Sequence, residues 1–210
     1  PKVETIYKYI DLLSKLKYNH LELYVEGFSF EYRSMPFVNS DMNHITVNEY
    51  KQIEKYCYDH FIDLVPNQNG FGHMTEWLKL DEFKHLANVD GLFNIWGSNR
   101  SSSTLDPTNV ESYELVKKMY EDMLPHSSSK YFNMNFDEPY ELGYGKSKEV
   151  CDEKGRETVF AEFFNKLAKV TKSHDKIPML WGDVIIHNPD AINKLDKDAI
   201  LIDWGYNENY

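Results

Sequence analysis

The chain has 210 residues, of which 41% are hydrophobic, and this is enough for one sizeable core. Its formal net charge of −11 and the lack of long Lys or Arg runs argue against nucleic acid and anionic membranes as partners. The two cysteines, Cys57 and Cys151, belong to no metal-ligand spacing. We therefore expect no disulfide framework, no metal and no cofactor.

Membrane association is not expected from the sequence either. The apolar runs are far shorter than the roughly 18 residues that a membrane helix needs. The first residues lack the charged and then apolar pattern of a signal peptide. We expect a soluble protein, with the cytoplasm favoured over secretion and the oligomeric state open.

Helical and strand periodicities alternate along the chain. Apolar residues recur at helical spacing over residues 3–16, and residues 21–25 alternate at strand spacing. Thr46 and Glu49 have the spacing of a capping box ahead of a second helix, and residues 62–66 form the next strand. Further helices are predicted to open at Asp106–Pro107, over 160–170 and at Asn188–Pro189, with strands over 132–137, 177–181 and 199–204.

This order of elements predicts the fold class. Five helix-then-strand units with no hairpin signals between them indicate parallel strands joined by crossover helices. The class is therefore α/β, as either a (β/α)8 TIM barrel or a doubly wound sheet. No G-x-G-x-x-G or Walker loop is present to favour the nucleotide-binding sheet.

Polar and aromatic residues collect where the predicted strands end. In a barrel all of these ends lie on one face, where barrel active sites are found. A long irregular stretch from Asn69 to Thr104, with a flexible Gly/Ser-rich end over residues 97–103, lies beside them and is a candidate lid. The strand-end residues are Glu26, Asn67, Gln68, Asp137, Glu138, Trp181, Asp183, Trp204 and Tyr206.

Asp137 and Glu138 are the main candidates for catalysis, although two acids at a strand end also occur in surface turns. Neighbours in a strand point to opposite faces, so the pair does not easily flank a glycosidic bond at about 5 to 5.5 Å as an ordinary retaining pair does. If both act, Asp137 has a role other than attack on the sugar.

Other strand-end residues have a functional and a structural interpretation. Glu26 shares a strand face with the polar residues two and four positions before it, so it either looks into the barrel mouth or is a solvated acid. His73 follows glycines that allow close backbone approach, and it is either a site residue or a structural hydrogen-bonder. Trp181 and Trp204, each followed by Gly, suit either a sugar platform or a core.

At these residues the chain resembles the catalytic domain of glycoside hydrolase family 20, and within it the hexosaminidase D-like branch. The resemblance runs through almost the whole chain, and its motifs in this order are far more specific than any one alone. They are residues 16–21 (LKYNHL), 65–73 (VPNQNGFGH), 105–108 (LDPT), 137–138 (DE) with 141–143 (ELG), 181–183 (WGD) and 204–206 (WGY).

The resemblance implies a (β/α)8 barrel that removes terminal N-acetylglucosamine or N-acetylgalactosamine from β-glycosides with retention. Glu138 takes the position of the general acid/base. Asp137 takes the position that holds the substrate acetamido group, whose oxygen is the nucleophile and forms an oxazolinium intermediate. The resemblance also makes His73 and Glu26 supports of the acid, Trp181 and Trp204 walls of the acetamido pocket, and Asp183 and Tyr206 lining residues.

Two departures from the family pattern stand out. Residues 133–136 read Asn-Met-Asn-Phe where many members have His and Gly before the acidic pair. The helix over 3–16 looks like the one after the first barrel strand. We therefore expect residues 1–210 to be part of a single catalytic domain, an incomplete barrel of about strands two to six, without the first, seventh and eighth strands.

The predicted function is thus a β-N-acetylhexosaminidase acting on an N-acetylated amino-sugar glycoside, with linkage and sugar preference open. One alternative is a catalytically silent carbohydrate-binding barrel of the same family. A third class is a metal-dependent isomerase or hydrolase barrel with Glu26, His73, Asp137 and Asp183 as ligands.

Overall fold

The five predicted strands form and run parallel. The computed structural model describes residues 2–39 and 44–206. In it β1 (His20–Glu22) pairs with β2 (Asp63–Val65) in parallel. A second parallel group places β6 between β5 and β7, and these strands are β5 (Tyr131–Asn133), β6 (Ile177–Trp181) and β7 (Ile200–Ile202).

The two groups of strands join between β2 and β5. Asn67 and Asn133 form a parallel bridge, and the Asn133 amide donates to the Pro66 carbonyl at 3.0 Å. The Gln68 amide returns a bond to the Asn133 carbonyl, also at 3.0 Å. The strand order is therefore β1-β2-β5-β6-β7, and the predicted α/β class is confirmed.

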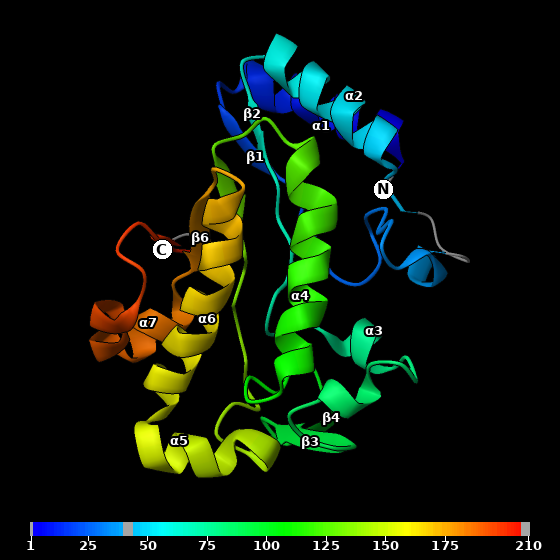
Figure 1. Cartoon of the computed structure of the whole chain (residues 1–210). Helices are drawn as coiled ribbons and strands as arrows, with labels where there is room; N and C mark the ends of the chain where they lie inside the picture. Colours follow the sequence, from blue (N-terminus) through cyan, green and yellow to red (C-terminus); the bar gives the residue numbers. More distant parts are fainter. Residues whose placement is uncertain (1, 40–43, 207–210) are drawn as a thin grey trace.

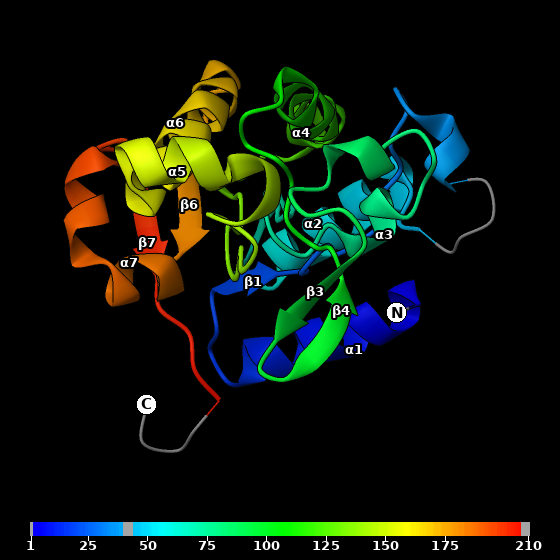
Figure 2. The same cartoon turned by 90° about the horizontal axis from the view of Figure 1, so that it is seen from below.

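Helices connect these strands and cover their outer side. The long helices α4 and α6 lie side by side, while α1 and α2 pack together at the opposite end from the hairpin of β3 (Leu92–Ile95) and β4 (Ser98–Ser101) (Figure 1). Seen from below, α4, α5 and α6 lie outside the strands (Figure 2). Their bounds are α1 (Val3–Lys15), α2 (Val47–Asp59), α3 (Thr75–Leu78), α4 (Val110–Met123), α5 (Lys148–Lys154), α6 (Arg156–Ser173) and α7 (Asp183–His187).

Short 3₁₀ turns complete the connections. They are η1 (Pro36–Asn39), η2 (Lys84–Leu86), η3 (Leu124–His126), η4 (Gly145–Ser147) and η5 (Pro189–Lys194). The last of them is the short helix predicted at Asn188–Pro189, in 3₁₀ form. Within the part of the chain described, no helix has both the length and the apolar character that a bilayer crossing requires.

The start of α4 differs from the prediction. The helix begins at Val110 rather than at Pro107. The Asp106 carboxylate accepts a bond from the Thr108 amide at 2.9 Å, which holds a turn ahead of the helix. Asn109 then caps the helix through its side chain. Asp106–Pro107 is therefore a turn before the helix, not its first turn.

The stretch from Asn69 to Thr104 is not irregular, and it contains a hairpin that the sequence analysis excluded. Strands β3 (Leu92–Ile95) and β4 (Ser98–Ser101) pair antiparallel across a Trp96–Gly97 turn. Both turn residues have positive φ, +51° and +80°, which is the geometry of a two-residue hairpin loop. The pattern escaped notice because Trp is an unusual first residue for such a turn, and β4 is polar and exposed throughout.

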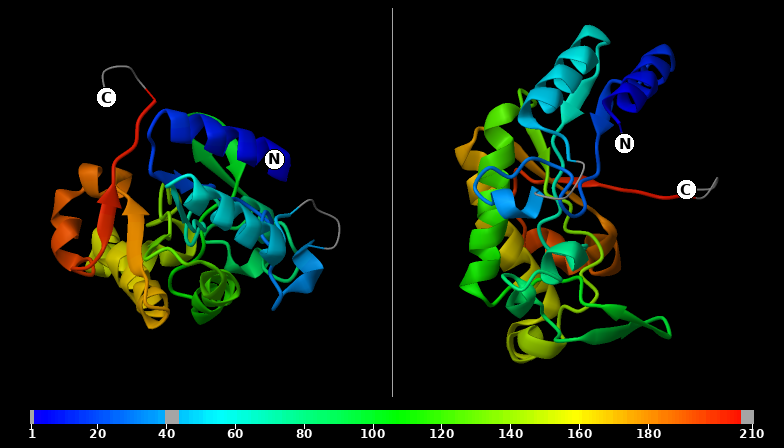
Figure 3. Two further views of the ribbon diagram at one scale, coloured as in Figure 1. Left: turned by 90° about the horizontal axis from the view of Figure 1, so that it is seen from above. Right: turned by 90° about the vertical axis from the view of Figure 1, so that its right-hand side faces the viewer.

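A buried carboxylate ties the end of this stretch to the loop that follows β5. The Glu141 side chain is fully buried and accepts a bond from the Ser103 amide at 2.7 Å. The Thr104 hydroxyl donates to the same carboxylate. The Asn88 side chain in turn donates to the Glu141 carbonyl at 2.5 Å. These bonds hold the base of the hairpin in place, and the right-hand view of Figure 3 shows the hairpin at the lower end of the molecule.

An aromatic cluster beneath α6 fixes the two loops that carry the predicted site. Phe71 and Phe136 are fully buried and pack against each other, with ring centroids 5.4 Å apart. Both also contact Phe160 and Phe163 of α6. The two phenylalanines come two residues before His73 and one residue before Asp137. Core packing therefore positions the backbone of the site directly.

The predicted capping box of α2 is present and provides a test of local stability. The Glu49 amide donates to the Thr46 hydroxyl at 3.2 Å, and the Thr46 amide donates to the Glu49 carboxylate at 2.8 Å. We expect Thr46→Ala to lower the free energy of unfolding by about 1 kcal/mol. The exposed helical Thr5→Ala is the control, because alanine favours a helix interior. Urea denaturation with equal midpoints for wild type and Thr46→Ala would contradict a stabilising cap.

Candidate active site

A cavity of about 360 Å³ lies beyond the carboxyl ends of the strands and gathers most of the predicted site residues. Six of the eight line it, together with one residue that the sequence analysis did not select. Glu26 and Asp183 lie next to this group rather than in the lining. The lining residues are Tyr24, His73, Asp137, Glu138, Trp181, Trp204 and Tyr206.

Three carboxylates surround the His73 imidazole. Its Nε2 lies 3.3 Å from Asp137 Oδ2 and 3.4 Å from Glu138 Oε2. Its Nδ1 lies 3.8 Å from Glu26 Oε1. Burial lowers the pKa of His73, but the interaction with Asp137 and the charges of Glu26 and Glu138 outweigh it and raise the pKa to about 9. At neutral pH the imidazole is therefore a cation among these acids.

The acidic pair does not follow strand geometry. Residues Asn135, Phe136 and Glu138 all have left-handed backbones, with φ of +64°, +65° and +48°. The expectation that Asp137 and Glu138 point to opposite faces is therefore wrong, because β5 ends at Asn133 and the pair lies in a tight turn. This turn brings both carboxylates to one nitrogen of His73.

Gly72 allows the loop that carries His73 to approach the loop that carries Asp137 and Glu138 closely. A Cβ atom at this position would lie 2.3 Å from the Asp137 carbonyl oxygen and 3.3 Å from the Glu138 carbonyl carbon. Only a residue without a side chain fits there. The prediction that glycines before His73 permit close backbone contact is confirmed.

Asp183 supports Glu138 from the start of α7, the helix that follows β6. It is the first residue of α7, and its Oδ2 accepts a bond from the Glu138 backbone amide at 3.1 Å. Burial, and next to it the charge of Asp137, raise the pKa of Asp183 above its usual value. Asp183 thus contacts the backbone of the acidic pair and does not line the cavity described above.

Tyr24 is the site residue that the sequence analysis missed. Its hydroxyl lies 3.0 Å from Asp137 Oδ2 and 3.2 Å from Asn69 Oδ1, and donates to these acceptors. Burial and the charge of Asp137 raise the pKa of Tyr24, so it stays protonated as a donor. The available signal was its place two residues before Glu26, on the strand face already predicted to look toward the site.

A network of buried amides sets the orientation of Trp181. Glu22 Oε2 accepts bonds from the Asn67 and Asn133 side chains at 2.8 and 2.7 Å. Asn67 also donates to Asn135 Oδ1 at 2.9 Å. The Trp181 indole donates to that same oxygen at 2.7 Å. The ring is therefore held at the cavity by a chain of polar contacts that crosses four strands.

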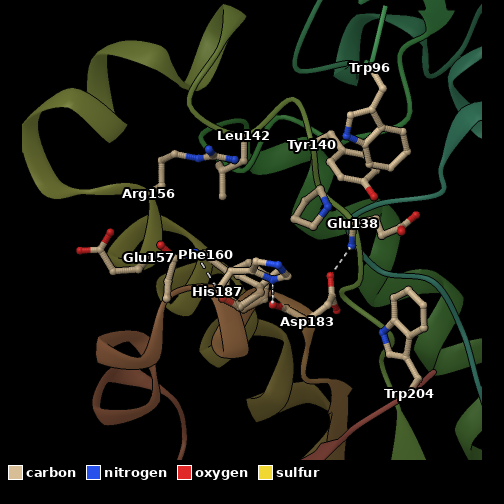
Figure 4. Close-up of a pocket in the computed structure, with 13 residues that line it drawn as sticks. Trp96, Glu138, Tyr140, Leu142, Arg156, Glu157, Phe160, Asp183, His187 and Trp204 are labelled. Carbon is tan, nitrogen blue, oxygen red and sulfur yellow. Dashed lines mark hydrogen bonds between the residues drawn. The ribbon is translucent and has the colours of Figure 1, made fainter. Parts of the chain in front are cut away.

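Trp204 and Tyr206 form the outer rim. Their ring centroids are 5.5 Å apart, and Tyr206 is 93% exposed. Trp204 also lines a second cavity of about 540 Å³, as does Glu138 (Figure 4). The two cavities therefore meet at Glu138 and Trp204. Across the described residues there is no group of three or more Cys, His, Asp or Glu placed to hold a metal ion.

The parallel strands thus carry adjacent carboxylates and aromatic walls at their carboxyl ends, which is where the active sites of barrel enzymes lie. The model of the glycosyl hydrolase family 20 catalytic domain matches residues 1–209. The chain belongs to this family, as its motifs predicted.

Curated relatives agree with this assignment. Lacto-N-biosidase of Bifidobacterium bifidum is 25% identical over 172 residues, which are 77% of this chain and 15% of the relative. Hexosaminidase D of Bos taurus is 27% identical over 157 residues, or 68% of this chain and 40% of the relative. The chain thus spans well under half the length of the curated relatives it matches.

Solved structures share the fold. The chitobiase of Flavobacterium johnsoniae has a TM-score of 0.80 and 23% identity, covering 98% of this chain and 32% of that one. The exo-β-N-acetylglucosaminidase of Vibrio harveyi, solved with N-acetylglucosamine, has a TM-score of 0.79 and 17% identity over 98% of this chain and 36% of that one. The similarity extends over almost all of the chain.

The raised pKa of His73 predicts a pH-dependent stability. Because the folded pKa of about 9 lies above the usual histidine value of 6.5, the contribution of His73 to stability is fully present below pH 6.5 and is lost as pH rises through 9. We expect the stability difference between wild type and His73→Asn to shrink over this range, and Asn suits the positive φ of +57° at this position. Urea titrations at pH 6, 7.5 and 9 measure it. A difference that is constant with pH would show that His73 is not the titrating cation.

Proposed function

We propose that this chain carries the acidic pair of a β-N-acetylhexosaminidase, which hydrolyses terminal N-acetylglucosamine or N-acetylgalactosamine β-glycosides with retention. The observation that carries the proposal is the convergence of Asp137 and Glu138 on one nitrogen of His73, beside a cavity walled by Trp181 and Trp204. Membership of glycosyl hydrolase family 20 supports it. The similarity to a hexosaminidase points to the same activity.

The proposed mechanism is substrate-assisted. An ordinary retaining pair flanks the glycosidic bond, whereas Asp137 and Glu138 share one imidazole and therefore lie on the same side. In this proposal Glu138 donates a proton to the glycosidic oxygen, and the substrate acetamido oxygen attacks the anomeric carbon. Asp137 holds the acetamido group and balances the charge of the oxazolinium intermediate. Water, deprotonated by Glu138, then opens that intermediate.

The remaining site residues support these two acids. His73 and Glu26 position Glu138 and Asp137 through the charge contacts described above. Trp181 and Trp204 form the walls of the acetamido pocket, and Asp183 and Tyr206 complete the surroundings. Tyr24 is added here as a donor that orients Asp137.

We also propose that residues 1–210 belong to a single (β/α)8 domain, in which the five parallel strands are strands two to six of the barrel. The order β1-β2-β5-β6-β7 with helices on the outer side supports this assignment. So does the fold shared with family members. The acidic pair then follows the third of these strands, β5, and faces the barrel mouth.

Substitutions of Glu138 and Asp137 are expected to lower the reaction rate in different ways. Glu138→Gln should lower the rate by about 10² to 10⁴ on substrates with poor leaving groups, as the loss of a general acid does. The loss should be smaller on good leaving groups, which need little protonation. Asp137→Asn should impair all leaving groups, because formation of the intermediate depends on the acetamido group. Steady-state kinetics of the full-length protein on a leaving-group series measures both.

Two further measurements separate the alternatives. A thiazoline mimic of the oxazolinium should bind much more tightly than N-acetylglucosamine if the reaction is substrate-assisted. Weak thiazoline binding together with a covalent adduct from a 2-fluoro sugar on a carboxylate would make one acid an ordinary nucleophile. Sugar binding without any turnover of a chromogenic N-acetylglucosaminide would instead indicate a catalytically silent barrel.

Tyr24→Phe tests the residue that orients Asp137. Removal of the hydroxyl deletes the bond to Asp137 Oδ2 and should reduce kcat by about 10-fold on every leaving group, in the pattern of Asp137→Asn. The exposed Tyr58→Phe on α2 is the matched control and should leave kcat unchanged. If Tyr24→Phe matched the control in kcat, or affected only poor leaving groups, the orienting role would be wrong.

A further inference from the structure

Asn135 holds Trp181 at two points beside the cavity of about 360 Å³. Its backbone carbonyl accepts a bond from the Trp181 amide at 2.9 Å, and its side-chain Oδ1 accepts a bond from the indole N–H at 2.7 Å. The indole is only partly buried and is not part of the hydrophobic core that the described residues form. Because core packing does not restrain the ring, the bond to Asn135 sets its orientation.

The Asn135 carboxamide is itself fixed, because its hydrogen-bond network fits in one arrangement. The indole N–H only donates, so Asn135 Oδ1 faces it, and Asn135 Nδ2 donates to Asn67 Oδ1 at 2.8 Å. Asn67 Nδ2 in turn donates to Asn135 Oδ1 at 2.9 Å and to Glu22 Oε2 at 2.8 Å. The Glu22 carboxylate only accepts. With a donor at one end and an acceptor at the other, neither amide can turn over without placing like groups against each other.

Asn135 also helps to set the position of Asp137. It lies two residues before Asp137 in the turn after β5, with a φ of +64° and a fully buried side chain. Its amide donates to Asn133 Oδ1 at 2.9 Å, which holds the turn from the side of the strand. Asp137 and Trp181 both line the cavity. One residue therefore sets the spacing between the Asp137 carboxylate and the Trp181 indole.

We propose that Asn135 determines which N-acyl group the cavity accepts, by holding the Trp181 indole at a fixed spacing from Asp137. The inference rests on the proposed function, in which Asp137 holds the amide of the substrate and Trp181 is a wall of the pocket around it. An acyl chain longer than acetyl extends from that amide toward the wall, and a fixed indole excludes it. Asn135 is a positioning residue, and it belongs to the segment in which this chain departs from the family pattern.

The test compares two substrates of the full-length protein that share a leaving group, the 4-nitrophenyl β-glycosides of N-acetylglucosamine and N-butanoylglucosamine. We expect wild type to favour the N-acetyl substrate in kcat/KM, since one methylene in such a pocket is worth about 10- to 200-fold. Asn135→Gly permits the positive φ but removes the carboxamide, and it should reduce this ratio of kcat/KM values about 10-fold. The control Asn88→Ala removes another fully buried amide, which donates to the Tyr144 carbonyl at 3.0 Å, and should leave the ratio unchanged even if both rates fall.

A change at Trp181 tests the same contact and leaves the turn at Asn135 intact. Replacement of Trp181 by 3-benzothienylalanine keeps the shape of the ring but puts sulfur in place of the N–H, and it should reduce the ratio by about the same factor. In that background Asn135→Gly should cause little further change, because both substitutions remove one contact. A wild-type ratio in both single variants would overturn the proposal, as would a full further loss in the double variant.

A binding measurement separates this inference from the proposed function. Hydrolysis of the two glycosides by wild type with equal kcat/KM would overturn the role of Asn135 in selectivity and leave the proposed function intact. If wild type hydrolysed neither glycoside, the proposed function would be contradicted instead. Calorimetry with N-acetylglucosamine and N-butanoylglucosamine would then decide the role of Asn135. A preference in affinity that Asn135→Gly narrows about 10-fold supports it, whereas equal affinities in wild type or an unchanged preference overturn it.

Discussion

The rest of the site depends on one cation held among three acids. Glu26, Asp137 and Glu138 all lie within 4 Å of the His73 imidazole, although Glu26 follows β1 and the acidic pair follows β5. Without a positive charge between them, carboxylates gathered this closely in a partly buried space would repel one another. The same attraction between the imidazole cation and these carboxylates raises the pKa of His73. The protonated imidazole therefore helps to hold these loops together.

Much of this arrangement could be predicted from sequence because it follows from local periodicity. Alternation alone placed Glu26 on the same face as Glu22 and Tyr24. In the structure each of these three side chains reaches a polar partner on a neighbouring loop or strand: Glu22 reaches Asn67 and Asn133, Tyr24 reaches Asp137, and Glu26 reaches His73. The partners themselves were not predictable, because they depend on the distance between strands. The hairpin and the left-handed turn were missed for a different reason, namely that Trp96 and Glu138 are residue types that disfavour the conformations they adopt.

Two asparagines, Asn133 and Asn135, depart from the family pattern just before the acidic pair, and the structure gives their side chains a role. Asn133 and Asn135 are fully buried. The Asn133 side chain donates to Glu22 on β1, and the Asn135 side chain donates to Asn67, which follows β2. Asn135 also has a φ of +64°, a conformation that asparagine tolerates better than most residues. The same residue therefore permits the turn and presents an acceptor to the Trp181 indole. An apolar replacement would leave the indole N–H without that partner, so these amides couple the shape of the turn to the aromatic wall.

Glu138 combines a strained backbone with the proposed role of proton donor. Its φ of +48° is unfavourable for a glutamate, and such a conformation persists only where the surroundings determine it. Asp183 accepts its amide from α7, and the Gly72 backbone packs against its carbonyl. Both contacts act on the backbone, so they fix where the side chain begins without engaging the carboxylate. The carboxylate stays available to His73 and to the junction of the two cavities.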